Sequence, residues 1–581
     1  MIKTLAKCIR EYKKASILAP LIIAGEVAIE CFIPFVTAEL VRNIEAGCDL
    51  SVIVKYGLIL ILLAVCSLAC GAFAGHFAAI AACGFAKNVR HDAYCAIQKY
   101  SFANMDKFST AGLVTRLTTD VSYVQMAFMM IIRTAIRSPM MLVFALIMAI
   151  SVSPKMSLAF AVVIPVLAIG LLIIFKNAHP IFKTVFKKYD NLNNSVQENV
   201  SAMRVVKSFV REDHEREKFK VASDDVAAGF TKAEKILALN SPLMQFCFNA
   251  LMLMVCFFGS QLIINSGSTE LDIAGFSALL TYGAQILMSL MMLSMIIVML
   301  SMSAESASRL SEILKEESTI KNPDHPIYEV RDGSIIFDNV NFAYSATAQK
   351  KSLSDINLYI ASGETVGVIG GTGSGKTSLI QLISRLYDVT EGSVKVGGVD
   401  VREYDIETLR NEVSVVLQKN VLFSGTIKEN LRWGDPNATD EDMIRICKLA
   451  QAHDFIDSFP DKYDTHITQG GTNVSGGQKQ RLCIARALLK KPKILILDDS
   501  TSAVDTKTDA LIRKAFAEEI PDTTKIIIAQ RISSVESADK IIVLDGGKIE
   551  SVGTHAELME KSPIYKEIYE SQNKGAKSDE E

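Results

Sequence analysis

The sequence lacks the cysteine patterns that mark metal-binding or disulfide-rich proteins. Its 11 cysteines include no CxxC pair and no Cys/His cluster at zinc spacing, and nine of them lie before residue 311. We therefore expect reduced thiols that act as small apolar side chains. The sequence also lacks a basic excess, because 61 Lys and Arg residues stand against 64 Asp and Glu residues. This balance argues against nucleic acid as a partner.

Charged residues are scarce and unevenly distributed. They make up 22% of the 581 residues, against 49% hydrophobic residues, which excludes a disordered chain. The first 310 residues are strongly apolar with a small excess of Lys and Arg, whereas the rest of the chain is polar with an excess of Asp and Glu. We therefore predict two chemically different domains, at 1–318 and 319–572, and a charged C-terminal tail at 573–581.

The apolar half contains six stretches long enough to cross a bilayer, which takes roughly 20 helical residues. The first follows a basic start, but it carries two glutamates and lacks a small-residue cleavage site, so we expect a retained helix rather than a signal peptide. The pattern predicts an all-α membrane domain of six helices embedded in the lipid bilayer. The six stretches lie at about 16–38, 54–84, 126–152, 154–177, 239–265 and 273–302.

Lys and Arg are concentrated in alternate connections between these stretches. The N-terminus and the connections 85–121 and 178–238 carry 5, 5 and 11 of them, whereas the other three connections carry 1, 1 and 0. Basic connections usually stay in the cytoplasm. We therefore expect a multi-pass protein of the cell membrane with both termini in the cytoplasm.

Four charged residues fall inside the apolar stretches. Glu26 and Glu30 are four residues apart near mid-bilayer, where ionised groups are costly and usually face water or a partner. Two interpretations of this pair stay open, an aqueous substrate path and a structural ion pairing. Arg133 and Arg137 are expected near the inner interface, where a structural role is favoured. Six methionines within 288–302 fit an adaptable apolar cavity.

The polar half contains a phosphate-binding loop in its strand–loop–helix setting, TVGVIGGTGSGKTSLI. Glycines let backbone N–H groups converge on phosphate oxygens, and the helix N-terminus adds positive potential. We expect Lys376 to reach the β- and γ-phosphates of ATP and the Thr377 hydroxyl to coordinate Mg²⁺. The loop residues predicted to bind ATP are Gly370, Gly371, Thr372, Gly373, Ser374, Gly375, Lys376, Thr377 and Ser378.

A second nucleotide motif lies farther along the chain. KILILDDS reads as a buried strand followed by Asp498, the carboxylate expected on the Mg²⁺ side of this fold. Together the two motifs predict an α/β P-loop NTPase domain fused to the six-helix membrane domain.

Between these motifs lies NVSGGQKQR at 473–481, and SAVD follows at 502–505. With these motifs nearly the whole chain resembles an ATP-binding-cassette (ABC) transporter of the exporter class. The resemblance implies that Tyr344 stacks on adenine, that Gln418 touches Mg²⁺, and that 196–212 is a cytoplasmic coupling segment. It also implies a signature motif that closes on the nucleotide bound by a partner subunit, and a loop that links the two nucleotide sites. These residues are Ser475, Gly476, Gly477 and Gln478 for the signature and Asp505 for the loop.

Two catalytic residues expected from the resemblance are replaced. The family normally has Glu after the second-motif aspartate and His after the following strand, whereas this chain has Asp499 and Gln530. Asp withdraws the carboxylate by about 1 Å, and a displacement of that size can cost roughly 100-fold in rate. Gln cannot become cationic or transfer a proton as His does. We therefore expect ATP to bind but to be hydrolysed slowly at this site.

This replacement resembles heterodimeric bacterial multidrug exporters, in which a degenerate subunit pairs with one that retains Glu and His. We expect a half-transporter that binds ATP and Mg²⁺, pairs with such a partner, completes the partner's site, and exports hydrophobic small molecules. Three alternatives stay open: a lipid flippase, a siderophore or peptide transporter on the same scaffold, and a regulatory or channel-like ABC protein.

Overall fold

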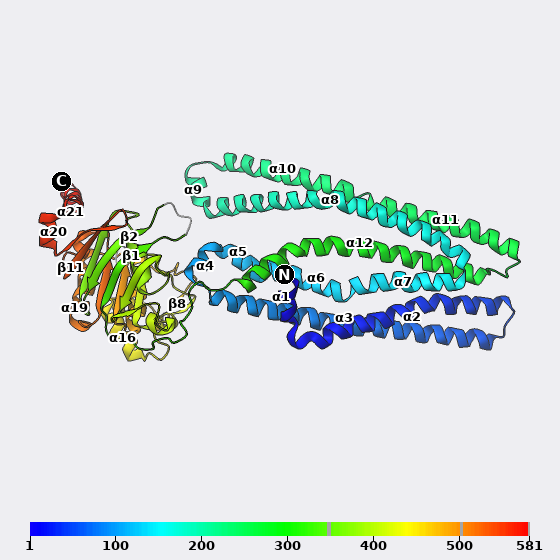
Figure 1. Ribbon diagram of the computed structural model, residues 1–581, viewed down its shortest axis with the longest axis horizontal. Coiled ribbons are helices and arrows are strands. Elements are labelled where there is room, and N and C mark those ends of the chain that lie inside the picture. The colour runs from blue at the N-terminus through cyan, green and yellow to red at the C-terminus, as the bar shows by residue number, and fades with distance from the viewer. Residues whose placement is uncertain (346–349, 500–503, 579–581) are drawn as a thin grey trace. The chain divides into compact units, whose positions relative to one another are not determined.

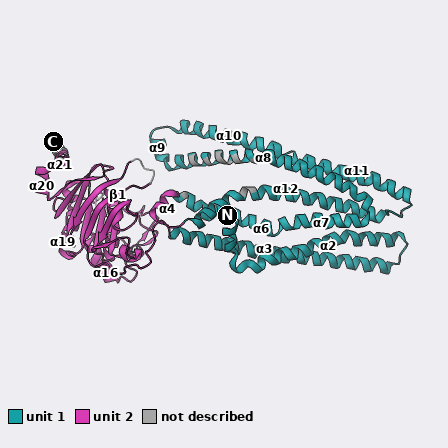
Figure 2. Ribbon diagram, in the orientation of Figure 1, with its two compact units in different colours: residues 1–99, 109–316 teal, residues 100–108, 317–581 magenta. Residues whose placement is uncertain are grey.

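The computed structural model describes residues 1–345, 350–499 and 504–578 (Figure 1). Its contacts divide the chain into two compact units (Figure 2). The first contains residues 1–99 and 109–316, and the second contains residues 100–108 and 317–581. The short segment 100–108, which lies between two stretches of the first unit in the sequence, thus belongs to the second unit by its contacts.

In its described part the first unit consists of helices and the short connections between them. Six helical runs there are long and apolar enough to cross a membrane, which confirms the predicted number. They span Ile2–Glu45, Leu50–Gln98, Gly112–Val152, Pro154–Phe182, Glu212–Ser266 and Ile273–Lys315. The individual elements are α1 (Ile2–Ala6), η1 (Lys7–Tyr12), α2 (Lys13–Glu45), α3 (Leu50–Gln98), α5 (Thr110–Thr115), η2 (Arg116–Asp120), α6 (Val121–Ile132), α7 (Thr134–Val152), α8 (Pro154–Ser201), α9 (Met203–Ser208), α10 (Glu212–Leu237), α11 (Asn240–Ser266) and α12 (Ile273–Lys315).

The turns between the apolar helices follow from local sequence signals. Ser153 caps α8 by accepting a hydrogen bond from the Met156 N–H, and Pro154 occupies the first turn, where its missing N–H costs nothing. Gly267 ends α11 in a left-handed conformation with φ of 60°. Asp272 then caps α12 through a 2.8 Å hydrogen bond from the Gly275 N–H.

Large apolar side chains fill the core of the first unit. Phe160 of α8 and Tyr282 of α12 are fully buried there, and the Tyr282 hydroxyl donates a 2.9 Å hydrogen bond to the Cys31 carbonyl of α2. Helix α8 runs alongside α10 and α11 (Figure 1). The segment 196–212 contains the end of α8, all of α9 and the start of α10.

The second unit is an α/β domain built on a six-stranded sheet of order β12-β11-β3-β10-β9-β6 and a four-stranded sheet of order β2-β1-β4-β5. Its strands are β1 (Ile335–Phe342), β2 (Leu353–Ile360), β3 (Thr365–Gly370), β4 (Glu391–Val396), β5 (Val399–Asp400), β6 (Val413–Val416), β7 (Gly425–Thr426), β8 (His466–Ile467), β9 (Ile494–Asp498), β10 (Thr524–Ile528), β11 (Lys540–Asp545) and β12 (Lys548–Gly553).

The helices of this unit surround the sheets and include α21 at the C-terminus. They are α4 (Phe102–Lys107), α13 (Lys376–Ile383), α14 (Ile406–Glu412), α15 (Ile427–Leu431), α16 (Asp440–Leu449), α17 (His453–Asp457), η3 (Lys462–Asp464), α18 (Gly476–Leu489), α19 (Thr506–Glu519), η4 (Ile532–Ser534), α20 (His555–Lys561) and α21 (Pro563–Ser578). Part of the expected tail at 573–581 is therefore helical, and residues 579–581 lie outside the described part.

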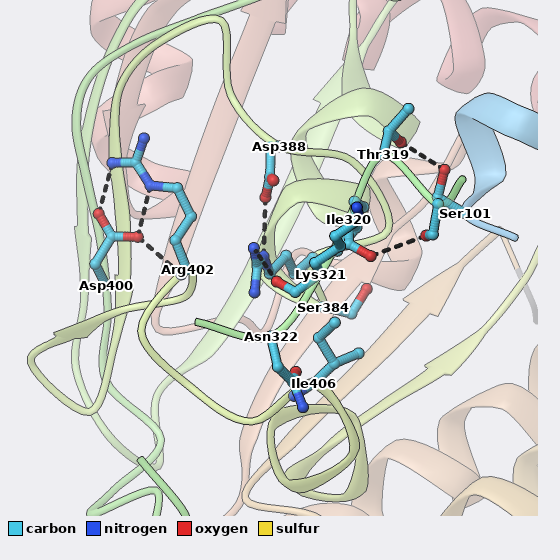
Figure 3. A network of polar contacts seen from close by, with 12 residues as sticks. Ser101, Thr319, Ile320, Lys321, Asn322, Ser384, Asp388, Asp400, Arg402 and Ile406 are labelled. Carbon is cyan, nitrogen blue, oxygen red and sulfur yellow. Dashed lines mark hydrogen bonds and ion pairs between the residues drawn. The ribbon is translucent and has the colours of Figure 1, made fainter. Parts of the chain in front are cut away.

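The segment 100–108 is tied into the second unit by polar contacts (Figure 3). The hydroxyls of Ser101 and Thr319 lie 2.6 Å apart. A few residues later, the Asn322 side chain accepts a 2.9 Å hydrogen bond from the Ile406 N–H at the start of α14. These contacts fix both chain segments that enter the unit from outside it.

Candidate nucleotide site

The parallel strands β3, β10 and β9 are neighbours in the six-stranded sheet and point the same way. Their carboxyl ends therefore meet at one edge, where ligands usually bind in open α/β sheets. Strand β3 ends at Gly370, β9 ends at Asp498, and β10 ends at Ile528. The register confirms this closeness, because Asp498 pairs with Ile528 across the β9–β10 ladder.

The loop from Gly370 to Gly375 can be built only with glycine at its two ends. A Cβ atom on Gly370 would lie 2.2 Å from the Leu544 carbonyl oxygen. Gly375 has φ of +100°, and its Cβ atom would lie 2.8 Å from the Ser352 carbonyl oxygen. These backbone constraints turn the chain sharply from β3 into the N-terminus of α13, which leaves that helix end directed into the loop.

Lys376 lies folded over this loop. Its Nζ donates 2.8 Å hydrogen bonds to the carbonyl oxygens of Gly370 and Gly371. Burial lowers the pKa of Lys376, an effect that the charges of Asp498 and Asp499 oppose. A half-buried ammonium group held by neutral oxygens beside a helix N-terminus fits an anion, so the loop suits the phosphates of a nucleotide.

Thr377 and Asp498 provide the oxygens that a magnesium ion prefers. The Thr377 Oγ1 donates a 3.2 Å hydrogen bond to the Asp498 Oδ2. Burial raises the pKa of Asp498, and the hydrogen bond from Thr377 partly offsets that rise. A nearby divalent cation would favour the ionised carboxylate, and Mg²⁺ is commonly held by a P-loop hydroxyl and one carboxylate.

Asp499 lies in contact with two amide side chains. The Gln530 Nε2 donates a 2.9 Å hydrogen bond to the Asp499 Oδ2, and the Gln418 Nε2 lies 3.4 Å from the same oxygen. Asp499 itself adopts a positive φ of 49°, which few non-glycine residues do. Its N–H donates a 2.9 Å hydrogen bond to the Ile528 carbonyl. The three residues that the sequence singled out are thus brought together at the sheet edge.

Tyr344 lies beside the start of α13 and is 47% exposed. Its hydroxyl is 2.9 Å from the Ser378 hydroxyl and donates a 2.9 Å hydrogen bond to Gln381. Its ring packs edge-on against Phe342 and Tyr387. Sequence reasoning missed Gln381 and Tyr387; Gln381 lies four residues after Thr377, at the helical spacing that places side chains on one face.

The other predicted residues lie at helix starts. Ser475 caps α18, where its hydroxyl accepts from the Gln478 N–H and the Gln478 side chain accepts a 2.9 Å hydrogen bond from the Ser475 N–H. Asp505 caps α19 by accepting a 2.9 Å hydrogen bond from the Thr508 N–H. In the described part, no hydrogen bond joins Ser475, Gln478 or Asp505 to the 370–378 loop. Residues 502 and 503 of the SAVD segment lie outside the described part.

The membrane unit contains an ion triad. Arg137 of α7 pairs with Glu26 and Glu30 of α2; its Nη2 lies 2.8 and 2.7 Å from the two carboxylate oxygens of Glu30. The contact brings the Arg137 guanidinium to the level of the two glutamates, so the three side chains form one ionic group between α7 and α2. Gly71 of α3 makes room for Glu26, since a Cβ atom there would lie 3.1 Å from its Oε1. Arg133 is exposed at the break between α6 and α7.

Comparisons with known proteins cover both units. The family profile described as "ABC transporter transmembrane region" matches residues 16–311, and the profile described as "ABC transporter" matches residues 353–502. An uncharacterized ABC transporter ATP-binding protein, YfiB of Bacillus subtilis, is 34% identical over 97% of both chains.

Two other relatives have descriptive names. An ATP-dependent lipid A-core flippase of Desulfotalea psychrophila is 31% identical over 84% of both chains. The probable multidrug resistance ABC transporter ATP-binding/permease protein YheI of Bacillus subtilis is 32% identical over 80% of this chain and 79% of that protein. The solved structure of a bacterial Atm1-family ABC exporter with ATP bound has the same fold, with a TM-score of 0.83 at 22% identity over 97% of this chain and 98% of that one.

Proposed function

Because the chain belongs to the ABC transporters, as a half-transporter of the exporter class with a membrane domain fused to an ATPase domain, we propose that it is the degenerate-site subunit of a heterodimeric exporter. The observation that carries this proposal is the Asp499–Gln530 pair. A shortened carboxylate and a side chain that cannot gain a proton occupy the positions where the family has Glu and His.

Binding of ATP and Mg²⁺ would use residues that the geometry brings together. Lys376 and the backbone N–H groups of the loop would hold the phosphates, Thr377, Asp498 and Gln418 would hold Mg²⁺, and Tyr344 would stack on the base. Mg²⁺ neutralises charge on the phosphates when it is bound. Asp499 would orient the attacking water poorly, because its carboxylate is one methylene shorter than that of Glu. This site would therefore hydrolyse ATP slowly and keep it bound for longer.

The partner is proposed to be a second half-transporter with Glu and His at its own site. Ser475, Gly476, Gly477 and Gln478 would close on the γ-phosphate bound by that partner. Ser475 and Gly476 are exposed and therefore accessible for this contact. Asp505 would lie in the loop between the two sites, and the segment 196–212 would transmit closure of the cassettes to the membrane helices.

The transported substrate is proposed to be a hydrophobic small molecule such as a drug, carried out across the cell membrane from the side where both termini lie. Exposed methionines along α12, among them Met288, Met291, Met292 and Met295, would provide an adaptable apolar wall. Glu26 and Glu30 would border the path with one net negative charge, because Arg137 neutralises only one carboxylate. A lipid substrate is the second candidate, since one relative is named as a flippase.

The proposal is tested in the heterodimer co-purified with its partner in proteoliposomes. We expect Lys376→Ala to weaken nucleotide binding by this chain more than it lowers turnover, because turnover depends on the partner's site. Asp499→Ala should change turnover little, whereas replacement of the partner's catalytic Glu should abolish it. Equal loss from these last two replacements would contradict a degenerate site. Export of a hydrophobic dye and export of a fluorescent lipid, measured in parallel, separate the two substrate classes.

A further inference from the structure

Gln572, on the last helix of the chain, holds the backbone of the segment that carries Gln530. The Gln572 Nε2 donates a 2.7 Å hydrogen bond to the Gln530 carbonyl oxygen, and its Oε1 accepts a 3.0 Å hydrogen bond from the Ile532 N–H. One side-chain amide therefore satisfies one backbone acceptor and one backbone donor, two residues apart. We call residues 529–534 the switch segment.

The helix that carries Gln572 is firmly packed. Tyr565 of α21 is fully buried, and its hydroxyl lies 2.8 Å from the His555 Nδ1 of α20. Ile564, Ile568 and Tyr569 pack against the hydrophobic core of the domain. Gln572 lies about one turn beyond Tyr569, so its amide is presented from a rigid element rather than from a loose tail.

Helix α19 holds the other side of the switch segment. The Arg513 Nη1 donates a 2.9 Å hydrogen bond to the Ser533 carbonyl, and the Ser534 hydroxyl donates a 3.3 Å hydrogen bond to Asp509. At the start of the switch segment, the Gln530 side chain is directed at Asp499. The C-terminal helix and α19 thus fix the backbone from which Gln530 projects toward the nucleotide site.

We propose that Gln572 is a positioning residue of the nucleotide site, and that it acts through Gln530. The inference rests on the proposed function, in which Gln530 lies where a γ-phosphate would be contacted. Release of the switch segment moves that amide without touching the loop that holds the α- and β-phosphates. Loss of Gln572 therefore weakens binding of a nucleoside triphosphate and spares the diphosphate.

The test measures the affinity of the full-length chain in nanodiscs for fluorescent mant-ATP and mant-ADP in the presence of Mg²⁺. In Gln572→Glu the acceptor for the Ile532 N–H remains, but the donor is lost and a carboxylate faces the Gln530 carbonyl. We expect mant-ATP binding to weaken about threefold to tenfold, the effect of one to two ordinary hydrogen bonds, with mant-ADP binding changed less than twofold. Glu567→Gln, an exposed position on the same helix, is the matched control and should leave both affinities unchanged.

A double-mutant cycle separates positioning from general damage. In a Gln530→Ala background the Gln572→Glu change should have no further effect on mant-ATP binding, because the side chain through which it acts is gone. Equal weakening of mant-ATP and mant-ADP, additive effects in the cycle, or unchanged affinities in Gln572→Glu would each overturn the inference.

Two further arms keep the outcome interpretable. Gln572→Ala carries the same expectation if Gln572→Glu does not fold, as judged by thermal unfolding. Lys376→Ala should strongly weaken binding of both nucleotides. If it does not, the proposed nucleotide site fails, whereas weakened binding in Lys376→Ala with no change in the Gln572 variants refutes only the role of Gln572.

Discussion

Restoring the family's two side chains should increase hydrolysis at this chain's own site. The perturbation is the double replacement Asp499→Glu and Gln530→His. In the structure the Asp499 Oδ2 is already engaged by Gln530 at 2.9 Å and by Gln418 at 3.4 Å. The extra methylene of Glu extends the carboxylate by about 1 Å toward the attacking water. A displacement of that size is worth roughly 100-fold in rate, so we expect a gain of about 10- to 100-fold.

The assay is phosphate release by the complex after the partner's catalytic Glu is replaced with Gln, so that hydrolysis reports the site of this chain. Asp499→Glu alone should give part of the gain, because Gln530 still cannot supply a charged donor. Asp498→Asn in the same background should abolish the signal by removing the Mg²⁺ carboxylate. The reasoning is refuted if the doubly replaced site hydrolyses ATP no faster than the unmodified one.

Two other predictions concern ionisable groups. Arg137→Leu leaves Glu26 and Glu30 without their cation and should lower the free energy of unfolding by about 3 kcal/mol. This is the lower end of the range for a buried ion pair, because the Arg137 side chain is 35% exposed. Thermal unfolding in detergent measures the loss, and the triple variant Glu26→Gln/Glu30→Gln/Arg137→Gln, which leaves no charge, should lose less stability. The pKa of Asp498 is raised in the folded state, so its contribution to stability is present below its unfolded pKa and is lost as pH rises through the folded value. Compared with Asp498→Asn, the nucleotide-free protein should therefore gain thermal stability on acidification, while its affinity for Mg²⁺ and nucleotide falls. Parallel pH profiles of thermal stability for the two proteins would contradict this.

The parts of the fold that local chemistry determines were predictable from the sequence. Long apolar runs specify membrane helices because every backbone polar group must be satisfied within the segment. The P-loop pattern specifies a strand, a glycine turn and a helix start, and parallel strand order then places Asp498 beside Thr377. The membrane charges were harder, because the depth of Arg137 was counted along one helix from its outer end. Its true neighbours lie on α2, and no count along a single helix reveals the relative register of two helices.

The contacts of Gln572 show a second limit of sequence reasoning. Both of its partners are backbone atoms, at Gln530 and Ile532, so no residue type at those positions signals the contact. The sequence predicts a charged tail at 573–581, whereas helix α21 continues through part of it to Ser578. Side-chain to backbone contacts of this kind become visible only when the structure brings the two segments together.

The amides around Asp499 bear on how the two proposed sites differ. Gln418 and Gln530 both donate to one carboxylate oxygen, and neither can take up or release a proton near neutral pH. These two hydrogen bonds hold the Asp499 carboxylate in place. On the proposed function, Asp499 therefore completes a polar wall around bound nucleotide and does not move to activate water. That arrangement favours retention of ATP, and it requires that proton transfer during the transport cycle occur at the site carried by the partner.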